Sequence, residues 1–218
     1  DRTRPSFVLM IGHEEEFPTQ YIKTSTSLQT PSDLACFTMG GNGDFIPDVF
    51  YGRFSVNSQE QLERQIAKTL QHEQTKVMIP PGIAIASDEG YDPTDVEYLT
   101  RMLKPLEDAF GFKFNRFHQA DSSATAKNIN KQLSEGSLWL NYIGHGSGFS
   151  WPSVYGSPYE TSDIEKYKPH DIKPIIIDVA CQNGRFNNEG RLGEVFMNAK
   201  YKDQVSGAVA YYGGSVDI

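Results

Sequence analysis

Three short segments of the 218-residue chain carry residue types that together could catalyse acyl transfer. His145 lies in "GHGSG", between glycines that leave its side chain uncrowded. Cys181 lies in "ACQNGRF", and the carboxylates Asp88 and Glu89 lie in "SDEGYDP". Taken alone, each has an ordinary alternative: a buried thiol, a surface turn histidine and loop carboxylates. Their joint position in the fold therefore decides what they indicate.

Catalysis by a thiol requires several groups in one place. A thiol at its ordinary pKa is mostly protonated at neutral pH, so an imidazole must remove that proton and later protonate the leaving group. A carboxylate can orient the imidazole, and two main-chain N–H groups must point toward the developing oxyanion. Gly146 has no side chain to block such an approach, and Cys181 can offer its own N–H from the start of a turn.

Each of the three segments follows an apolar run that predicts a buried strand. These runs are "PGIAIAS" (81–87), "SLWLNYIG" (137–144) and "KPIIIDVA" (173–180). In an open parallel sheet, functional residues lie beyond the carboxyl ends of the strands. If the three strands are parallel, the carboxylates, His145 and Cys181 reach the same edge of the sheet.

Strand and helix patterns alternate along the rest of the chain. Further strands are predicted at 7–12, 48–56, 113–119 and 207–214, and helices at 57–74, 94–111, 123–136 and 191–200. Ser58 and Gln61 have the spacing of a capping box, and Pro105 is expected to kink or split its helix. The alternation predicts an α/β fold with an open, largely parallel sheet flanked by helices.

Composition and turn signals limit the organisation and the partners. The Pro80–Pro81–Gly82 turn signal predicts two units, an N-terminal α/β subdomain at 1–78 and a second subdomain at 79–218 that carries His145 and Cys181. A net charge of −8 argues against a nucleic-acid partner. No run of about 18 apolar residues predicts a membrane span, and the opening "DRTRPSF" does not resemble a signal peptide.

Other classes of site find little support in the sequence. The two cysteines, Cys36 and Cys181, are far apart and have no zinc-site spacing, although one disulfide between them remains an alternative. The five histidines show no H-x-x-x-H spacing. A small-molecule hydrolase or a nucleotide-binding protein would be expected to carry G-x-S-x-G, a P-loop or G-x-G-x-x-G after a strand, and none is present.

The segments around His145 and Cys181 resemble the gingipain family of cysteine peptidases, which belongs to the caspase-like folds. The family pattern Tyr-x-Gly-His-Gly-Ser is similar to Tyr142–Ser147, and its Ala-Cys-x-Asn-Gly is similar to Ala180–Gly184. "IASDEG", "FVLMIG" and "VFYGRFSV" resemble further family segments. The similarity runs from about residue 6 to the end of the chain.

The resemblance implies a role for each matching residue. Cys181 corresponds to the nucleophile, His145 to the general base and acid, and Glu89 to the acidic residue near the histidine. The N–H groups of Gly146 and Cys181 correspond to the oxyanion hole. Asp95 corresponds to the acid at the floor of a pocket for Arg or Lys; its alternative is an ordinary acid in the first turn of a helix.

The resemblance also implies a setting for the protein. It implies a secreted or cell-surface bacterial peptidase that acts on proteins or peptides and needs no cofactor for catalysis. Structural calcium is an expected ion, with oxygen ligands from the loops "GNGDF", "DEGYDPTD" and "NNEG". The oligomeric state is not indicated. Relative to the family, parts of the first subdomain and the C-terminal part of the catalytic subdomain are expected to be missing.

Two alternatives to a peptidase stay open. A non-catalytic caspase-like scaffold or binding fragment would keep the fold without a working pocket. A sortase-like surface transpeptidase would use the same acyl-enzyme but transfer the acyl group to an amine. Labelling of Cys181 distinguishes the first alternative, and product analysis distinguishes the second.

Overall fold

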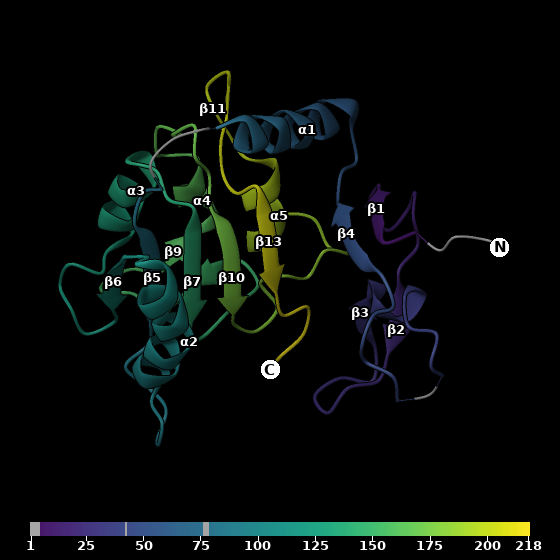
Figure 1. Cartoon of the computed structure of the whole chain (residues 1–218), viewed down its shortest axis with the longest axis horizontal. Coiled ribbons are helices and arrows are strands. Elements are labelled where there is room, and N and C mark those ends of the chain that lie inside the picture. Colours follow the sequence, from purple (N-terminus) through teal and green to yellow (C-terminus); the bar gives the residue numbers. More distant parts are fainter. Residues whose placement is uncertain (1–4, 42, 76–78) are drawn as a thin grey trace.

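A central parallel sheet organises the chain (Figure 1). The computed structural model describes residues 5–41, 43–75 and 79–218. In this part of the chain the largest sheet has five strands in the order β13-β10-β7-β5-β6, and every neighbouring pair is parallel. The strands are β5 (Gly82–Ala86), β6 (Phe114–His118), β7 (Trp139–Ile143), β10 (Ile175–Val179) and β13 (Ala210–Gly213).

Both faces of this sheet are covered. All five residues of β5 are buried, and they alternate between two cores. Ile83 and Ile85 pack in the larger core, and Ala84 and Ala86 pack in the smaller core. This two-sided burial explains why the strand is continuously apolar. The predicted α/β fold, with an open parallel sheet flanked by helices, is confirmed.

Five helices accompany the strands in the described residues: α1 (Gln59–Gln74), α2 (Asp95–Phe110), α3 (Ala126–Ser134), α4 (Thr161–Ile164) and α5 (Leu192–Asn198). Helix α2 supplies Leu99 and Leu103 to the smaller core. Residues of α3, α4 and α5 pack in the larger core. In α2, α3 and α5 the apolar residues recur with the helical period and face the sheet. Helix α1 differs, because its buried residues are Gln65 and Lys68 while Ile66 and Leu70 are exposed.

Helix α1 begins at the predicted cap, Ser58, but one of the two hydrogen bonds of the predicted capping box has a different donor. Ser58 Oγ accepts a hydrogen bond from Gln61 N at 3.3 Å. The Gln61 side chain accepts from Asn57 N at 2.9 Å rather than from Ser58 N. The cap is thus half of the predicted capping box, because the return bond goes one residue further back.

Pro105 does not split its helix. Helix α2 continues through Pro105 to Phe110. Both of its ends are well satisfied: Thr94 and Glu97 form a reciprocal capping box, and Gly111 closes the helix with a left-handed φ of 64°. We attribute the continuity to these caps and to burial of Leu99 and Leu103, which offset the loss of one N–H donor.

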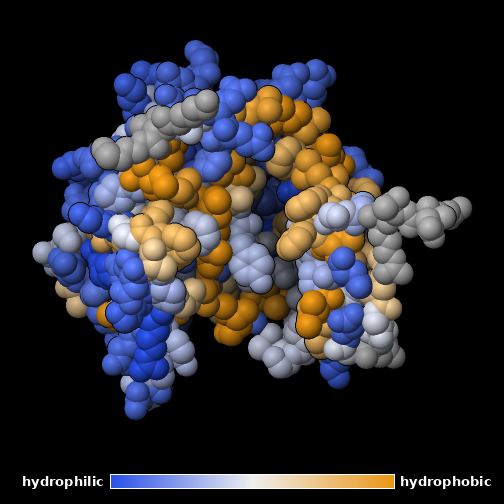
Figure 2. Space-filling view, viewed as in Figure 1, coloured by the Kyte–Doolittle hydropathy of each residue, from blue (hydrophilic) through white to orange (hydrophobic). Residues whose placement is uncertain are grey.

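The N-terminal residues form smaller sheets beside the central one. Strand β1 (Phe7–Ile11) pairs in parallel with β4 (Phe50–Phe54), and β2 (Gln20–Ile22) forms an antiparallel pair with β3 (Thr30–Ser32) next to a short 3₁₀ helix (Asp33–Cys36). Arg53 Nε donates to Asp33 Oδ2 at 2.7 Å within this region. Between β4 and β13 the surface is hollowed by about 600 Å³ (Figure 2).

Helix α1 connects the two regions. It contacts α5, and Gln65 Nε2 donates to Asn198 Oδ1 at 2.8 Å. The buried Lys68 donates to the main-chain oxygen of Phe196 at 3.4 Å. The predicted boundary between residues 78 and 79 adjoins residues 76–78, which lie outside the described residues, so the division into 1–78 and 79–218 stays a prediction.

Two antiparallel pairs complete the described strands. Strand β8 (Ser150–Trp151) pairs with β9 (Tyr159–Glu160), and β11 (Lys200–Tyr201) pairs with β12 (Gln204–Val205). The first pair matters for function because Trp151, which is fully buried, stacks on Tyr142 with ring centroids 5.0 Å apart. It anchors the far end of the loop that starts at His145.

Candidate active site

His145, Cys181 and Glu89 follow three adjacent parallel strands. Strand β7 lies between β10 and β5. Three residues pair level with one another at the ends of these strands: Ala86, Ile143 and Val179. His145 and Cys181 each come two residues after their strand, and Glu89 comes three after β5. The structure therefore brings the three segments to one edge of the sheet, as the strand pattern predicts.

His145 and Glu89 are in direct contact. His145 Nε2 lies 2.7 Å from Glu89 Oε2. Both side chains are well exposed, by 64% and 55%. Because the carboxylate takes Nε2, Nδ1 is the ring nitrogen left to exchange a proton with another group. This is the orienting contact that a catalytic imidazole needs.

The main chain of His145 is held on both sides. Tyr142 Oη donates to His145 O at 2.7 Å, and His145 N donates to Ser153 Oγ at 3.0 Å. The same phenol oxygen accepts from Ser153 N at 3.1 Å. Burial raises the pKa of Tyr142 far above its ordinary value, so its hydroxyl stays protonated and remains a donor. The imidazole of His145 is therefore exposed, while its main chain is held by the buried side chains of Tyr142 and Ser153.

Cys181 lies at the start of a tight turn after β10. Its thiol is free and partly exposed, and so is that of Cys36, so the disulfide left open by the sequence does not form. Gln182 has a positive φ of 60°, which is uncommon for a residue with a side chain. Gln182 N donates to Val216 O at 3.0 Å, which holds the turn against the segment after β13.

The loop after His145 packs directly on the Cys181 main chain. A Cβ atom at position 146 would lie 2.2 Å from Cys181 O and 2.7 Å from Cys181 N. Only glycine fits this approach, because such distances are shorter than real contacts between these atoms. Gly146 therefore keeps the His145 loop and the Cys181 turn in contact.

Asp95 directly follows the loop that carries Glu89. It is the first residue of α2, it is half-buried, and its Oδ2 accepts a hydrogen bond from Ser87 Oγ at the end of β5. Asp95 N donates to Glu89 O at 3.1 Å. The geometry matches an acid in the first turn of a helix, and it also places the carboxylate beside the proposed site.

Comparisons with known proteins identify the family of the chain. The family model of peptidase family C25 matches residues 1–218. The chain belongs to peptidase family C25. It is 28% identical to gingipain R2 of Porphyromonas gingivalis over 97% of this chain, which corresponds to 29% of that relative's length.

Solved structures show the same fold. The crystal structure of the Arg specific cysteine proteinase gingipain R aligns with a TM-score of 0.83 and 28% identity, covering 97% of this chain and 49% of that one. The complex of Porphyromonas gingivalis RgpB pro- and mature domains aligns with a TM-score of 0.82 and 27% identity, covering 97% of this chain and 50% of that one. The chain thus has the caspase-like fold of the C25 family and spans about half the length of its solved relatives.

The sequence pattern does not identify the residues that support the candidate site from within. It indicates Tyr142 and Asn183 only as motif positions, and it places Asp178 in an apolar strand. The signal in the sequence was the charge in "IIIDVAC", because an ionisable residue inside a buried run must have polar partners. Its partners come from three other segments and could not be read from spacing.

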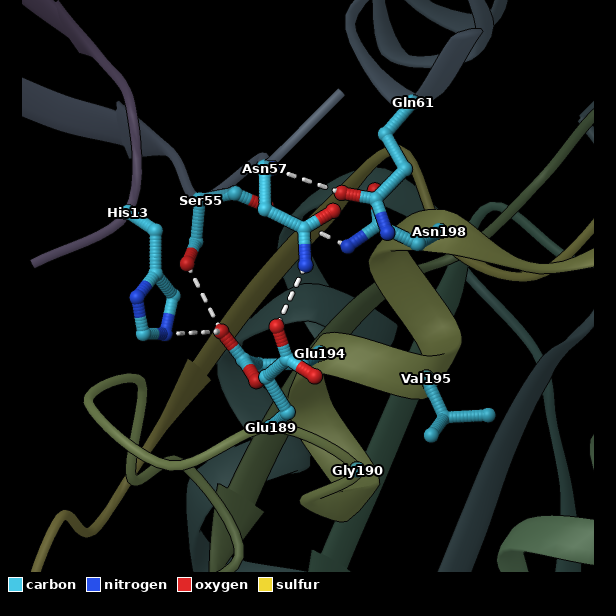
Figure 3. A pocket seen from close by; sticks show the side chains of 9 residues that line it. All are labelled: His13, Ser55, Asn57, Gln61, Glu189, Gly190, Glu194, Val195 and Asn198. Carbon is cyan, nitrogen blue, oxygen red and sulfur yellow. Dashed lines mark hydrogen bonds and ion pairs between the residues drawn. The ribbon is translucent and has the colours of Figure 1, made fainter. Parts of the chain in front are cut away.

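A second polar cluster lies where the N-terminal region meets α5 (Figure 3). It encloses about 150 Å³. Glu194, in the first turn of α5, accepts from Ser55 Oγ at 2.7 Å, and His13 Nε2 lies 3.8 Å from the same carboxylate. Burial raises the pKa of Glu194 to about 7. This pocket is separate from the strand ends that carry His145 and Cys181.

In the described ranges no three His, Cys, Asp or Glu side chains converge in a way that could hold a metal ion. A calcium ion in this part of the chain would therefore also need main-chain or amide oxygen atoms as ligands. Among the same residues, no helix has the length and apolar character needed to cross a membrane.

Proposed function

We propose that this chain provides the Cys–His site of a cysteine endopeptidase that cleaves peptide bonds after Arg or Lys. One observation carries the proposal. His145 is 2.7 Å from Glu89, and the next residue, Gly146, packs directly on the main chain of Cys181. Membership of peptidase family C25 supports the same reaction class. The activity is proposed for the whole protein, because the matched relatives are longer than this chain.

The proposed reaction has two half-reactions. His145 removes the proton of Cys181, and the thiolate forms a bond to the carbonyl carbon of the substrate. The N–H groups of Gly146 and Cys181 stabilise the oxyanion. The C–N bond then breaks as His145 protonates the leaving amine, and a thioester to Cys181 remains. His145 deprotonates a water molecule that attacks this thioester; the C–S bond breaks, the acid is released, and His145 returns the proton to Cys181. Glu89 orients the imidazole and stabilises its protonated form.

Preference for a basic residue is assigned to Asp95. A carboxylate at the base of a pocket can pair with a guanidinium or an ammonium group, and two parallel hydrogen bonds would favour arginine. The half-burial of Asp95 and its place directly after the Glu89 loop support this assignment. The related gingipain R is described as Arg specific, which agrees with it.

One observation favours the second candidate, a non-catalytic caspase-like scaffold or binding fragment. The main chain of Ile218 lies beside the thiol, with Ile218 N 3.5 Å and Ile218 O 3.7 Å from Cys181 Sγ. A substrate carbonyl would have to approach the same sulfur. While Ile218 keeps that place, it competes with a substrate carbonyl for access to the sulfur.

Three further properties belong to this proposal. Calcium is a structural ion rather than a catalytic one. The protein acts on proteins or peptides outside the cell or at its surface, which is consistent with its similarity to proteins of Porphyromonas gingivalis. Because transpeptidases use the same acyl-enzyme, products formed with an added amine acceptor decide between hydrolysis and transfer.

The decisive experiment is covalent labelling by peptidyl acyloxymethyl ketones that carry Arg, Lys or Leu next to the reactive group. Intact mass and peptide mapping locate the label. We expect the Arg or Lys probe, but not the Leu probe, to modify Cys181, and Cys181→Ala to abolish this labelling and peptide cleavage. Cys36→Ala is the matched control because Cys36 is an exposed free thiol in the 3₁₀ helix Asp33–Cys36, outside the strand ends that carry the candidate site.

Each other outcome has a definite meaning. Labelling by all three probes keeps the nucleophile and removes the role of Asp95. Persistence of cleavage in Cys181→Ala shows that the nucleophile is wrongly assigned. Absence of labelling in protein with native circular dichroism supports the scaffold.

A further inference from the structure

Asp178 is a buried carboxylate on the strand that leads to Cys181. It is only 3% exposed, and its Oδ2 accepts hydrogen bonds from Trp151 Nε1 at 2.9 Å, Asn183 Nδ2 at 3.1 Å and Tyr211 Oη. Its Oδ1 has no hydrogen-bond partner in the described part of the chain. Burial raises the pKa of Asp178 to about 6, while the three donors oppose that rise. The group is therefore mostly a carboxylate at neutral pH.

Asn183 carries the effect of this carboxylate to the His145 loop. An ionised carboxylate only accepts hydrogen bonds, so Asn183 must turn its NH₂ group toward Asp178. Its Oδ1 then faces the other way and accepts from Gly148 N at 2.8 Å. Asn183 is fully buried, so no solvent competes for either end of the amide. The charge of Asp178 thereby fixes which end of the Asn183 amide faces Gly148 in the His145 loop.

The same three segments are joined by main-chain bonds. Asn183 O accepts from Gly193 N, and Gly148 O accepts from Leu192 N, both at 2.9 Å. The first residues of α5 therefore bind the main chain of both Asn183 and Gly148, the two residues that the Asn183 side chain joins. Trp151, at the end of the His145 loop, binds the same Asp178 oxygen as Asn183 does. The His145 loop is thus tied to Asp178 at two points, directly and through Asn183.

We propose that Asp178 and Asn183 are positioning residues that hold the His145 loop in register with the Cys181 turn. This inference rests on the proposed Cys–His function. Neither residue needs to touch the substrate, because both act through the main chain of loops 144–151 and 180–184. A buried charge costs stability relative to a well-packed apolar group, so its presence here is better explained by the orientation that it imposes.

The test measures the reactivity of Cys181 directly, before any substrate is bound. All variants carry Cys36→Ala, and the rate of alkylation of Cys181 by iodoacetamide is followed by peptide mapping as a function of pH. A thiol paired with imidazole reacts at a pH well below that of a free thiol. The variants are Asn183→Ala, Asp178→Asn, His145→Ala and, as a matched control, Tyr159→Phe. The control loses a partly buried hydrogen bond of 2.9 Å to Asn130 in the same core, and its phenylalanine ring can keep the packing against Trp151.

We expect Asn183→Ala to lower the alkylation rate at mildly acidic pH by about 10- to 100-fold, because small displacements of reacting groups have effects of that order. Asp178→Asn keeps the shape of the side chain and one acceptor oxygen. It should therefore also lower the alkylation rate of Cys181, but by less than Asn183→Ala does. For a peptide with Arg at the cleavage site, kcat falls and KM changes little. Tyr159→Phe keeps the wild-type profile.

The outcomes separate this inference from the function on which it rests. If His145→Ala leaves the profile unchanged, Cys181 is not paired with His145 and the proposed function fails. If His145→Ala changes the profile while folded Asn183→Ala and Asp178→Asn do not, the function stands and the positioning role is overturned. If Asn183→Ala does not fold, Asp178→Asn alone decides. If neither folds, the network is merely structural and the inference is overturned.

Discussion

Gly146 and Cys181 approach so closely that no side chain fits between their main chains. A Cβ atom at position 146 would lie 2.2 Å from the carbonyl oxygen of Cys181 and 2.9 Å from the Cβ of Ala180. The nearest atoms belong to backbone and to a short side chain, which cannot move away cheaply. The absence of a side chain in "GHGSG" therefore serves the contact between two loops, in addition to access to His145.

Replacement of Gly146 by alanine is expected to lower kcat/KM by about 100-fold, because displacement of one oxyanion donor has an effect of that order. Peptide cleavage and the urea midpoint of unfolding are measured together. Gly52→Ala is the control, since a Cβ there meets open space. A Gly146→Ala enzyme with full activity would contradict the proposed placement of the two donors.

Glu89→Gln is expected to lower kcat/KM by less than about tenfold, because an exposed ion pair contributes only about 1 kcal/mol or less. The glutamine keeps a hydrogen-bond acceptor for His145 and removes the charge. The loss should shrink at high salt, where the wild-type pair is screened. Asp88→Asn, in the same loop, serves as the control. His145→Ala, by comparison, is expected to lose about 10³-fold, as removal of a general acid and base does.

Asp95→Asn is expected to reduce kcat/KM for Arg substrates by about 100-fold while it leaves a neutral substrate unaffected, because a charge-assisted bidentate pair is lost. Asparagine can still accept the hydrogen bond from Ser87. Ser87→Ala is the complementary control, since it removes that bond and keeps the charge. An equal loss for both substrates would show that Asp95 serves only the start of α2.

The sequence allowed prediction of the central sheet because its strands are buried on both faces. Continuous apolar runs such as β5 and β10 are visible without any tertiary information. The strands of the pairs β8–β9 and β11–β12 have only two residues each, which is too short for an alternation of apolar and polar residues to be visible. Of the two effects expected of Pro105, a kink or a split, the split does not occur, because end caps and packing are not local to a proline.

The candidate site was predictable to the extent that it depends on strand ends. Parallel strands that end at one edge place His145, Cys181 and Glu89 together regardless of detail. The pairing of Asp178 with Trp151 and Asn183 depends on side-chain directions from separate loops, which no spacing encodes. The roles of the individual site residues stay predictions until the variants are measured.

Glu194 should make the stability of the protein depend on pH. Its folded-state pKa of about 7 lies above its ordinary value of 4.5, chiefly because of burial, with repulsion from Glu189 adding to the rise. The folded state therefore binds this proton more tightly than the unfolded state does. The stabilisation is complete below the unfolded pKa and is lost as pH rises through about 7.

Glu194→Gln cannot ionise and still accepts the bond from Ser55. Between about pH 5 and pH 8 its free energy of unfolding should rise relative to wild type by about 3 kcal/mol. Urea unfolding at several pH values measures this difference. Glu63→Gln, on the exposed side of α1, should run parallel to wild type. If Glu194→Gln keeps the pH dependence of the wild type, that dependence does not arise from Glu194.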